Sequence, residues 1–311
     1  MTARHILTIS CPDTVGIVAA VSGFLAGRGC NIIDSAQFGD RTSGLFFLRI
    51  FLAAPEAGPD HEALAVQFAE VARRFGMTWH LHDAERPQRL LILVSKFGHC
   101  LNDLLYRYRV GGLNVEIPAI VSNHRDFYQL AAWHNVPFHY LPVKPDNKAE
   151  QEARLWEIIE QERIDLVVLA RYMQVLSPEL CDRLAGRAIN IHHSFLPSFK
   201  GAKPYHQAFA RGVKLIGATA HYVTSNLDEG PIIEQAVERV DDDVLDRDQA
   251  RAPQRDRAVR GVDGGLRAAA LHGAAGLGRR PADALAAAGR PFAAVVHRPG
   301  RDAQARDRAL P

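Results

Sequence analysis

The stretch Ala188–Gly201, Ala-Ile-Asn-Ile-His-His-Ser-Phe-Leu-Pro-Ser-Phe-Lys-Gly, decides how the second half of the chain is interpreted. Its first four residues predict a short buried strand. The polar cluster that follows stands where open α/β sheets place their ligands, beyond the carboxyl end of a strand. Asn190 and His192 are two residues apart, so in extended backbone both side chains lie on one face. An amide and an imidazole can then converge on a single substrate oxygen.

Asp228 is the third candidate, in the turn-like run Asn226–Pro231. Its carboxylate can orient a water molecule or keep a nearby histidine charged. Together the three side chains suit acyl chemistry without a covalent nucleophile. A strand-end histidine and an ordinary turn aspartate explain the same residues equally well, because the distance between separate segments cannot be read from sequence.

Three linked motifs carry a family resemblance: Asn190–Gly201, Gly217–His221 (Gly-Ala-Thr-Ala-His) and Asp228–Ile233 (Asp-Glu-Gly-Pro-Ile-Ile). Together they resemble the catalytic signature of the folate-dependent formyltransferase fold. The resemblance implies Asn190, His192 and Asp228 as the catalytic residues. His193, His206 and His221 are secondary candidates, and a packed strand histidine is the favoured interpretation of His221.

The segment Ala170–Ser177, Ala-Arg-Tyr-Met-Gln-Val-Leu-Ser, resembles the loop that lines the pterin pocket in the same family. By resemblance, the folate substrate would contact Met173, Gln174, Val175 and Leu176, with Asn226 closing the other side. Taken without the resemblance, Met173 is more readily interpreted as a core residue.

An amino-terminal segment resembles a second family. The run Cys11-Pro-Asp-Thr-Val-Gly-Ile17, with Asn31 after the first expected helix, is similar to an ACT domain. The expected order of elements in residues 1–84 is βαββαβ, the ferredoxin-like arrangement, with Thr14 as the cap of the first helix. The resemblance implies an amino-acid effector site at Asp13, Gly16 and Asn31. A dimerisation module without a ligand is the open alternative, because a tight turn also requires glycine and aspartate.

A short polar connection at residues 85–88 leads to a second domain over residues 89–240. Its first strand is almost entirely apolar, as expected of a strand covered on both faces of a parallel sheet. The alternation of strands and helices predicts an open, mostly parallel, doubly wound α/β sheet. The expected elements are strand 89–95, helix 100–108, strand 114–121, helix 126–134, strand 138–140, helix 148–162 and strand 166–170.

The turn Ser95–Cys100 after that first strand has one glycine and lacks the glycine pattern of a dinucleotide site. In relatives that transfer a formyl group to a phosphorylated ribosyl amine, the corresponding turn is rich in glycine and serine. Its absence favours water as the acceptor. The combined domains are similar to hydrolases that release formate from 10-formyltetrahydrofolate, with no cofactor or metal. Formyl transfer to an amine, or a catalytically inactive amino-acid-binding regulatory protein, remain the alternatives.

Charge and cysteine content narrow the class of protein. Residues 1–240 contain 24 basic and 25 acidic residues, which argues against nucleic-acid binding. The 4 cysteines are scattered, as expected of reduced thiols in a cytoplasmic protein. No apolar run is long enough to cross a membrane, and no signal sequence is expected. We therefore expect a cytoplasmic homo-oligomer that binds neither nucleic acid nor membrane.

The last segment differs from the rest of the chain in amino-acid composition. Residues 241–311 contain 18 Ala, 13 Arg and 10 Asp but no Ser, Thr, Lys, Glu, Ile, Tyr, Trp, Asn, Cys or Met. Ordinary domains do not lose ten residue types at once. A reading-frame shift in a GC-rich gene near residue 241 is the favoured interpretation, and a natural disordered Ala/Arg-rich tail is the alternative.

Overall fold

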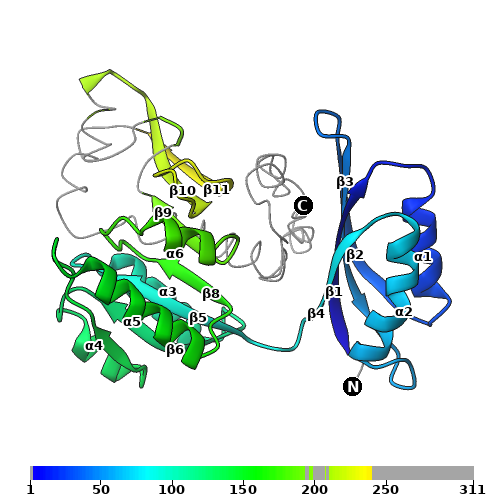
Figure 1. Cartoon of the computed structure of the whole chain (residues 1–311), viewed down its shortest axis with the longest axis horizontal. Coiled ribbons are helices and arrows are strands. Elements are labelled where there is room, and N and C mark those ends of the chain that lie inside the picture. Colours follow the sequence, from blue (N-terminus) through cyan, green and yellow to red (C-terminus); the bar gives the residue numbers. More distant parts are fainter. Residues whose placement is uncertain (1–2, 193–195, 199–206, 208–209, 240–311) are drawn as a thin grey trace, which may run out of the picture.

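The computed structural model describes residues 3–192, 196–198, 207 and 210–239. These residues form two separate β-sheets, one built from residues 4–83 and one from residues 88–239 (Figure 1). Of the predicted linker at 85–88, residues 85–87 lie in the connection between the last strand of one sheet and the first strand of the other, and Gln88 begins that strand. The tail predicted at 241–311 lies outside the described residues.

The first sheet is antiparallel and has the strand order β2-β3-β1-β4. Burial alternates along β1 and β3, so one face is apolar, and α1 and α2 cover it (Figure 1). The ferredoxin-like βαββαβ order is confirmed. Its elements are β1 (Arg4–Pro12), α1 (Ile17–Ala26), β2 (Asn31–Asp40), β3 (Leu45–Ala53), α2 (His61–Arg74) and β4 (Thr78–Asp83).

The two helices begin differently. The side chain of Asp60 caps α2 by accepting a 2.8 Å hydrogen bond from the Ala63 amide. The prediction that Thr14 caps the first helix is wrong. The helix begins after Gly16, which has φ 98° and makes no side-chain cap, because the left-handed turn needed there suits glycine and not threonine.

The second sheet has the order β11-β10-β9-β8-β5-β6-β7. Strands β5 to β9 are parallel and β10 and β11 are antiparallel, which confirms a mostly parallel sheet. Its elements are β5 (Gln88–Val94), α3 (His99–Arg109), β6 (Val115–Ser122), α4 (Tyr128–Trp133), β7 (Phe138–Tyr140), α5 (Lys148–Gln161), β8 (Leu166–Leu169), α6 (Pro178–Arg183), β9 (Ala188–His192), β10 (Leu215–Tyr222) and β11 (Ile232–Arg239). Helix α6 and strand β11 were not predicted, and β10 was anticipated only by the interpretation of His221 as a strand histidine.

Each face of this sheet is covered by a helix layer. Alternate residues of β5 enter different cores: Leu90, Ile92 and Val94 pack with α3 and α4, whereas Leu91 and Leu93 pack with α5 and α6. All five are fully buried, which explains why the strand is apolar throughout. No helix among the described residues is long and apolar enough to span a bilayer.

Polar residues line up across the carboxyl edge of the parallel strands. The register pairs Leu93 with Leu169 and Leu169 with Asn190. Two residues further along these strands, Ser95, Arg171 and His192 stand at one level of the sheet. The row continues through Thr219, which pairs with His192, to Gln235, which pairs with Thr219. Residues distant in sequence therefore meet at this edge.

A histidine in the first sheet predicts how stability depends on pH. Burial lowers the pKa of His82 to about 4, and the charges of His80 and His61 add to the effect. The unfolded chain binds a proton there near pH 6.5, so between pH 6.5 and about 4 it holds more protons than the folded chain. Stability should be complete above pH 6.5 and fall as the pH decreases. In denaturant unfolding, the His82→Gln variant should lose less free energy of unfolding over this pH range than the unaltered chain. An equal loss in the two proteins would contradict the lowered pKa of His82.

Candidate active site

The centre of the site lies on β9 and its antiparallel neighbour β10. Asn190 pairs with His221, and His192 pairs with Thr219. Because paired residues and alternate residues of a strand share a face, these four side chains lie on the same side of the sheet. It is the face covered by α5 and α6, since Asn190 also pairs with Leu169 of that core. The structure thus brings Asn190 and His192 together as the sequence predicted.

His221 holds the amide of Asn190. Its Nδ1 lies 2.9 Å from the carbonyl oxygen of Tyr222, so Nδ1 must carry a hydrogen and donate it. In the neutral ring Nε2 is then an acceptor, and the Nδ2 atom of Asn190 lies 3.2 Å away and donates to it. Burial lowers the pKa of His221, although the Tyr222 carbonyl and the Asp228 carboxylate oppose the shift. The neutral ring is therefore the form that fits both contacts.

Asp228 reaches the same face from the loop between β10 and β11. Its Oδ1 lies 3.5 Å from Nδ1 of His192 and 3.7 Å from Nε2 of His221. Asp228 has φ 56°, a left-handed conformation that aspartate tolerates better than most residues. Gly230 permits the tight return of the loop, because a β-carbon there would stand 1.7 Å from the Tyr222 carbonyl oxygen.

The cluster is buried. His192, His221 and Asp228 are 7%, 2% and 9% exposed. A carboxylate in such surroundings requires a cationic or hydrogen-bonding partner, and Nδ1 of His192 is placed to provide it. The amide of Asn190 keeps a second N–H beyond the one that His221 accepts. An oxyanion between Asn190 and His192 could therefore accept hydrogen bonds from both side chains.

Thr219 and Gln235 complete the row and were not predicted as site residues. The Thr219 hydroxyl oxygen accepts hydrogen bonds from the Leu196 amide and from Nε2 of Gln235, each at 3.1 Å. The same Nε2 also donates to the Leu196 carbonyl at 2.9 Å. These bonds fix the backbone shortly after His192. The only sequence signal was the position of Thr219 inside the motif Gly217–His221.

The predicted folate contacts lie on two loops. Met173 and Val175 are 55% and 56% exposed, so the interpretation of Met173 as a core residue does not hold. Leu227 is also exposed, next to the exposed Asn226, and Gln174 is half-buried. Leu176 differs, because its side chain packs in the core and only its backbone can face a ligand. Three exposed apolar side chains near a buried polar cluster are suited to a flat heterocycle.

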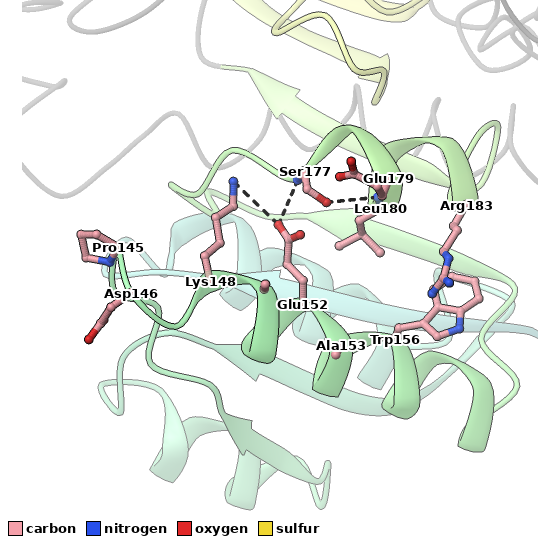
Figure 2. A pocket seen from close by; sticks show the side chains of 11 residues that line it. Pro145, Asp146, Lys148, Glu152, Ala153, Trp156, Ser177, Glu179, Leu180 and Arg183 are labelled. Carbon is pink, nitrogen blue, oxygen red and sulfur yellow. Dashed lines mark hydrogen bonds and ion pairs between the residues drawn. The ribbon is translucent and has the colours of Figure 1, made fainter.

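The end of the loop that carries Met173 is anchored by α5. The Glu152 carboxylate accepts a 2.9 Å hydrogen bond from the Ser177 amide and lies 3.9 Å from the Lys148 ammonium group (Figure 2). The Ser177 hydroxyl oxygen in turn accepts from the Leu180 amide at the start of α6. These contacts border a surface cavity of about 590 Å³ between α5 and α6, lined by Pro145, Asp146, Lys148, Ala149, Glu152, Ala153, Trp156, Ser177, Glu179, Leu180 and Arg183. Its polar groups bind one another, so we assign it a structural role.

The predicted effector residues of the first domain are not all together. The Asp13 carboxylate lies beside Gly39, 3.2 Å from where a β-carbon of that residue would stand. Asn31 stands at the other end of β2, paired with Ala53. Eight residues of extended strand separate Asn31 from Gly39, about 25 Å. A single chain therefore brings Asp13 and Gly16 to one end of the sheet and Asn31 to the other.

No group of three His, Cys, Asp or Glu side chains within residues 3–192 and the later described segments could hold a metal ion. The secondary candidates His193 and His206 lie outside the described residues.

Comparison with known proteins agrees with both domains. Residues 88–256 match the formyl transferase family and residues 5–66 match the ACT domain family. A formyltetrahydrofolate deformylase from a Corynebacterium species is 52% identical over 238 residues, 76% of this chain and 83% of the relative.

Solved structures give the same result. The formyltetrahydrofolate deformylase of Burkholderia mallei has a TM-score of 0.77 at 50% identity, covering 85% of this chain and 93% of that one. A phosphoribosylglycinamide formyltransferase from Bacillus halodurans is more distant, with a TM-score of 0.51 at 29% identity, covering 60% of this chain and 94% of that one. The structural match to the Burkholderia mallei deformylase covers enough of the chain to include both domains. The chain belongs to the formyltetrahydrofolate deformylase family.

Proposed function

We propose that the chain is a hydrolase that cleaves the C–N amide bond of 10-formyltetrahydrofolate to give formate and tetrahydrofolate. One observation carries the assignment: the partly buried Asn190 lies beside the buried His192 and Asp228 in a chain 52% identical to a deformylase. The released formate supplies purine biosynthesis, and the reaction balances the one-carbon folate pools. The cytoplasm, where folate and purine metabolism take place, is the proposed location.

In the proposed mechanism water attacks the formyl carbon, and the developing oxyanion accepts hydrogen bonds from the Asn190 amide and a protonated His192. Asp228 takes a proton from the attacking water and passes it to the folate nitrogen as the C–N bond breaks. Its negative charge also stabilises the protonated His192, 3.5 Å away. The reaction requires no metal or organic cofactor, because each proton has a donor and an acceptor within the cluster.

His221 is proposed as a positioning residue. It accepts a hydrogen bond from one N–H of Asn190, which fixes the plane of the amide and leaves the other N–H for the substrate oxygen. Met173, Gln174, Val175, Leu176 and Asn226 are proposed to bind the folate. The exposed apolar surface of Met173 and Val175 supports this placement.

The first domain is proposed to bind an amino-acid effector in a homo-oligomer. β2 is an edge strand of ten residues that is exposed over most of its length. An edge of this kind can pair with another strand. Antiparallel pairing with the same strand of a second copy would place the partner's Asn31 at the end of β2 where Asp13 lies. An effector site with contributions from Asp13, Gly16 and Asn31 can then form between two copies.

Formate release tests the function. The purified chain should release formate and tetrahydrofolate in equal amounts from 10-formyltetrahydrofolate without any amine. Asp228→Asn should lower kcat by about 10²–10⁴-fold, because it removes the proton acceptor. Asn190→Ala should lower it by about 10²–10³-fold, the cost of one oxyanion donor.

Glu160→Gln, at the exposed end of α5, serves as the matched control and should keep full activity. Formyl transfer that depends on an added amine, with no formate in its absence, would support the transferase alternative. A folded chain that binds amino acids but turns over no folate would support the regulatory alternative.

The role of His221 makes a separate prediction. His221→Ala leaves the Asn190 amide without its acceptor, so kcat should fall about 10- to 100-fold, equivalent to about 1–3 kcal/mol. KM for the folate should change little, because the proposed folate contacts lie on other residues. His221→Gln should recover part of kcat, since its amide oxygen can accept the same hydrogen bond. Equal kcat in the two variants, or a change confined to KM, would show that His221 only fills space.

A further inference from the structure

Arg171 stands beside the catalytic cluster in a conformation that its residue type disfavours. It leaves β8 at the level of His192, two residues after the pair Leu169 and Asn190. Its φ is 64°, in the left-handed region where glycine is the common choice. Positions that keep a disfavoured residue are concentrated at functional sites.

The backbone of Arg171 is fixed by the turn after β5. The Ser95 amide donates to the Arg171 carbonyl at 3.2 Å, and the Met173 amide donates to the Ser95 hydroxyl at 3.0 Å. The Ser95 hydroxyl itself donates to the amide oxygen of Asn123 at 2.7 Å. Ser95 and Asn123 are both buried, so this network holds the start of the 171–176 loop rigidly against the neighbouring strands.

The side chain of Arg171 points away from the proposed folate loop. Its guanidinium carbon lies 5.3 Å from the ring centre of Phe97, in the turn that leads from β5 to α3. Its charge also acts on Cys100 in the first turn of α3. The guanidinium group therefore lies toward α3, whereas Tyr172 and Leu176 pack with the α5 and α6 core on the other face.

The two sides of the reaction centre are lined by different kinds of side chain, apolar on one side and cationic and aromatic on the other. The folate would enter on the side of the exposed Met173 and Val175. A second substrate that attacks the formyl carbon would have to approach along the row of strand ends, over β8 and β5. Arg171 and the half-exposed Phe97 stand at those strand ends. Phe127, whose ring packs against Gly98, fills space behind the same turn.

We propose that Arg171 and Phe97 form a barrier that excludes amine acceptors and so restricts the nucleophile to water. The proposal rests on the hydrolytic function proposed above. The barrier acts by bulk and by charge. The neighbouring guanidinium and phenyl groups occupy the path of a large acceptor. An aliphatic amine is mostly an ammonium ion at neutral pH, and the Arg171 charge disfavours its approach. Water is small and neutral and meets neither obstacle.

Two N–H-bearing atoms of Arg171, Nε and Nη1, are buried, and no described residue accepts from them. Burying two N–H groups without an acceptor among the described residues is unfavourable, so local stability does not explain why this position carries an arginine. Exclusion of a cation requires the positive charge of Arg171, but it does not require a hydrogen-bond acceptor for the Arg171 N–H groups.

The test measures how the formyl group divides between water and an amine. Glycinamide is the probe, in a buffer free of other amines, and N-formylglycinamide and formate are quantified together. In transfer the amine nitrogen bonds to the formyl carbon, the C–N bond to folate breaks, and the amine proton ends on the folate nitrogen. The unaltered chain should give formate, with formylated amine only at the level of the protein-free reaction.

Arg171→Gly removes both bulk and charge and suits the left-handed backbone. It should raise the ratio of formylated amine to formate at least tenfold. Arg171→Gln keeps bulk without charge and should give a smaller rise, and Arg171→Lys the smallest. Phe97→Ala, on the exposed turn, should also raise the ratio. This variant tests the barrier if Arg171→Gly does not fold. Tyr106→Ala, an exposed aromatic residue on α3, should leave the ratio unchanged.

A ratio that stays at the unaltered value in the folded Arg171 and Phe97 variants, while formate release continues, would overturn the proposal. Loss of formate release in these variants without a change in the ratio would also overturn it, because Arg171 would then serve the substrate. Failure of the unaltered chain to release formate is a different result, which would count against the proposed function itself.

Discussion

One hydrogen-bond relay orients the Asn190 amide: the ring of His221 donates to the Tyr222 carbonyl, and the Asn190 amide donates to the other nitrogen of that ring. Because a carbonyl can only accept, the first bond sets the tautomer, and the tautomer makes the second bond possible. The orientation of the Asn190 amide therefore follows from the backbone of β10. Protonation of His221 would replace the acceptor by a donor and release Asn190, so the lowered pKa of His221 keeps the relay intact below pH 6.5.

The same relay settles how two histidines share one carboxylate. Asp228 lies within 3.7 Å of both rings in a buried site, and two buried cations beside one anion would be costly. Burial lowers the pKa of His221, so the proposed mechanism places the positive charge on His192 and keeps His221 neutral. Two of the four non-glycine residues with left-handed backbone in the described part of the chain, Arg171 and Asp228, border this centre, which is where stored strain is expected.

Sequence reasoning predicted what local patterns determine. The spacing of Asn190 and His192 placed both on one face, and the apolar run in residues 89–95 predicted a strand buried on both sides. The interpretation of His221 as a packed strand histidine anticipated a strand there, but not the antiparallel pairing of β10 with β9 that brings His221 opposite Asn190. Nor could sequence reasoning show that Asp13 and Asn31 lie at opposite ends of β2, because strand register depends on pairing between distant segments. The Thr14 prediction failed on a local point, since the left-handed turn at Gly16 moved the helix start past it.

The ¹⁵N chemical shifts of the histidine side chains would test the relay most directly, with His221 assigned through the His221→Gln variant. The relay requires that at pH 7 His221 is neutral with its proton on Nδ1, and the lowered pKa of His221 predicts that it stays so as the pH falls below 6.5, the ordinary pKa of histidine. A His221 that carries its proton on Nε2, or that is already charged at pH 7, could not accept from Asn190. Either result would contradict the proposed arrangement of the site.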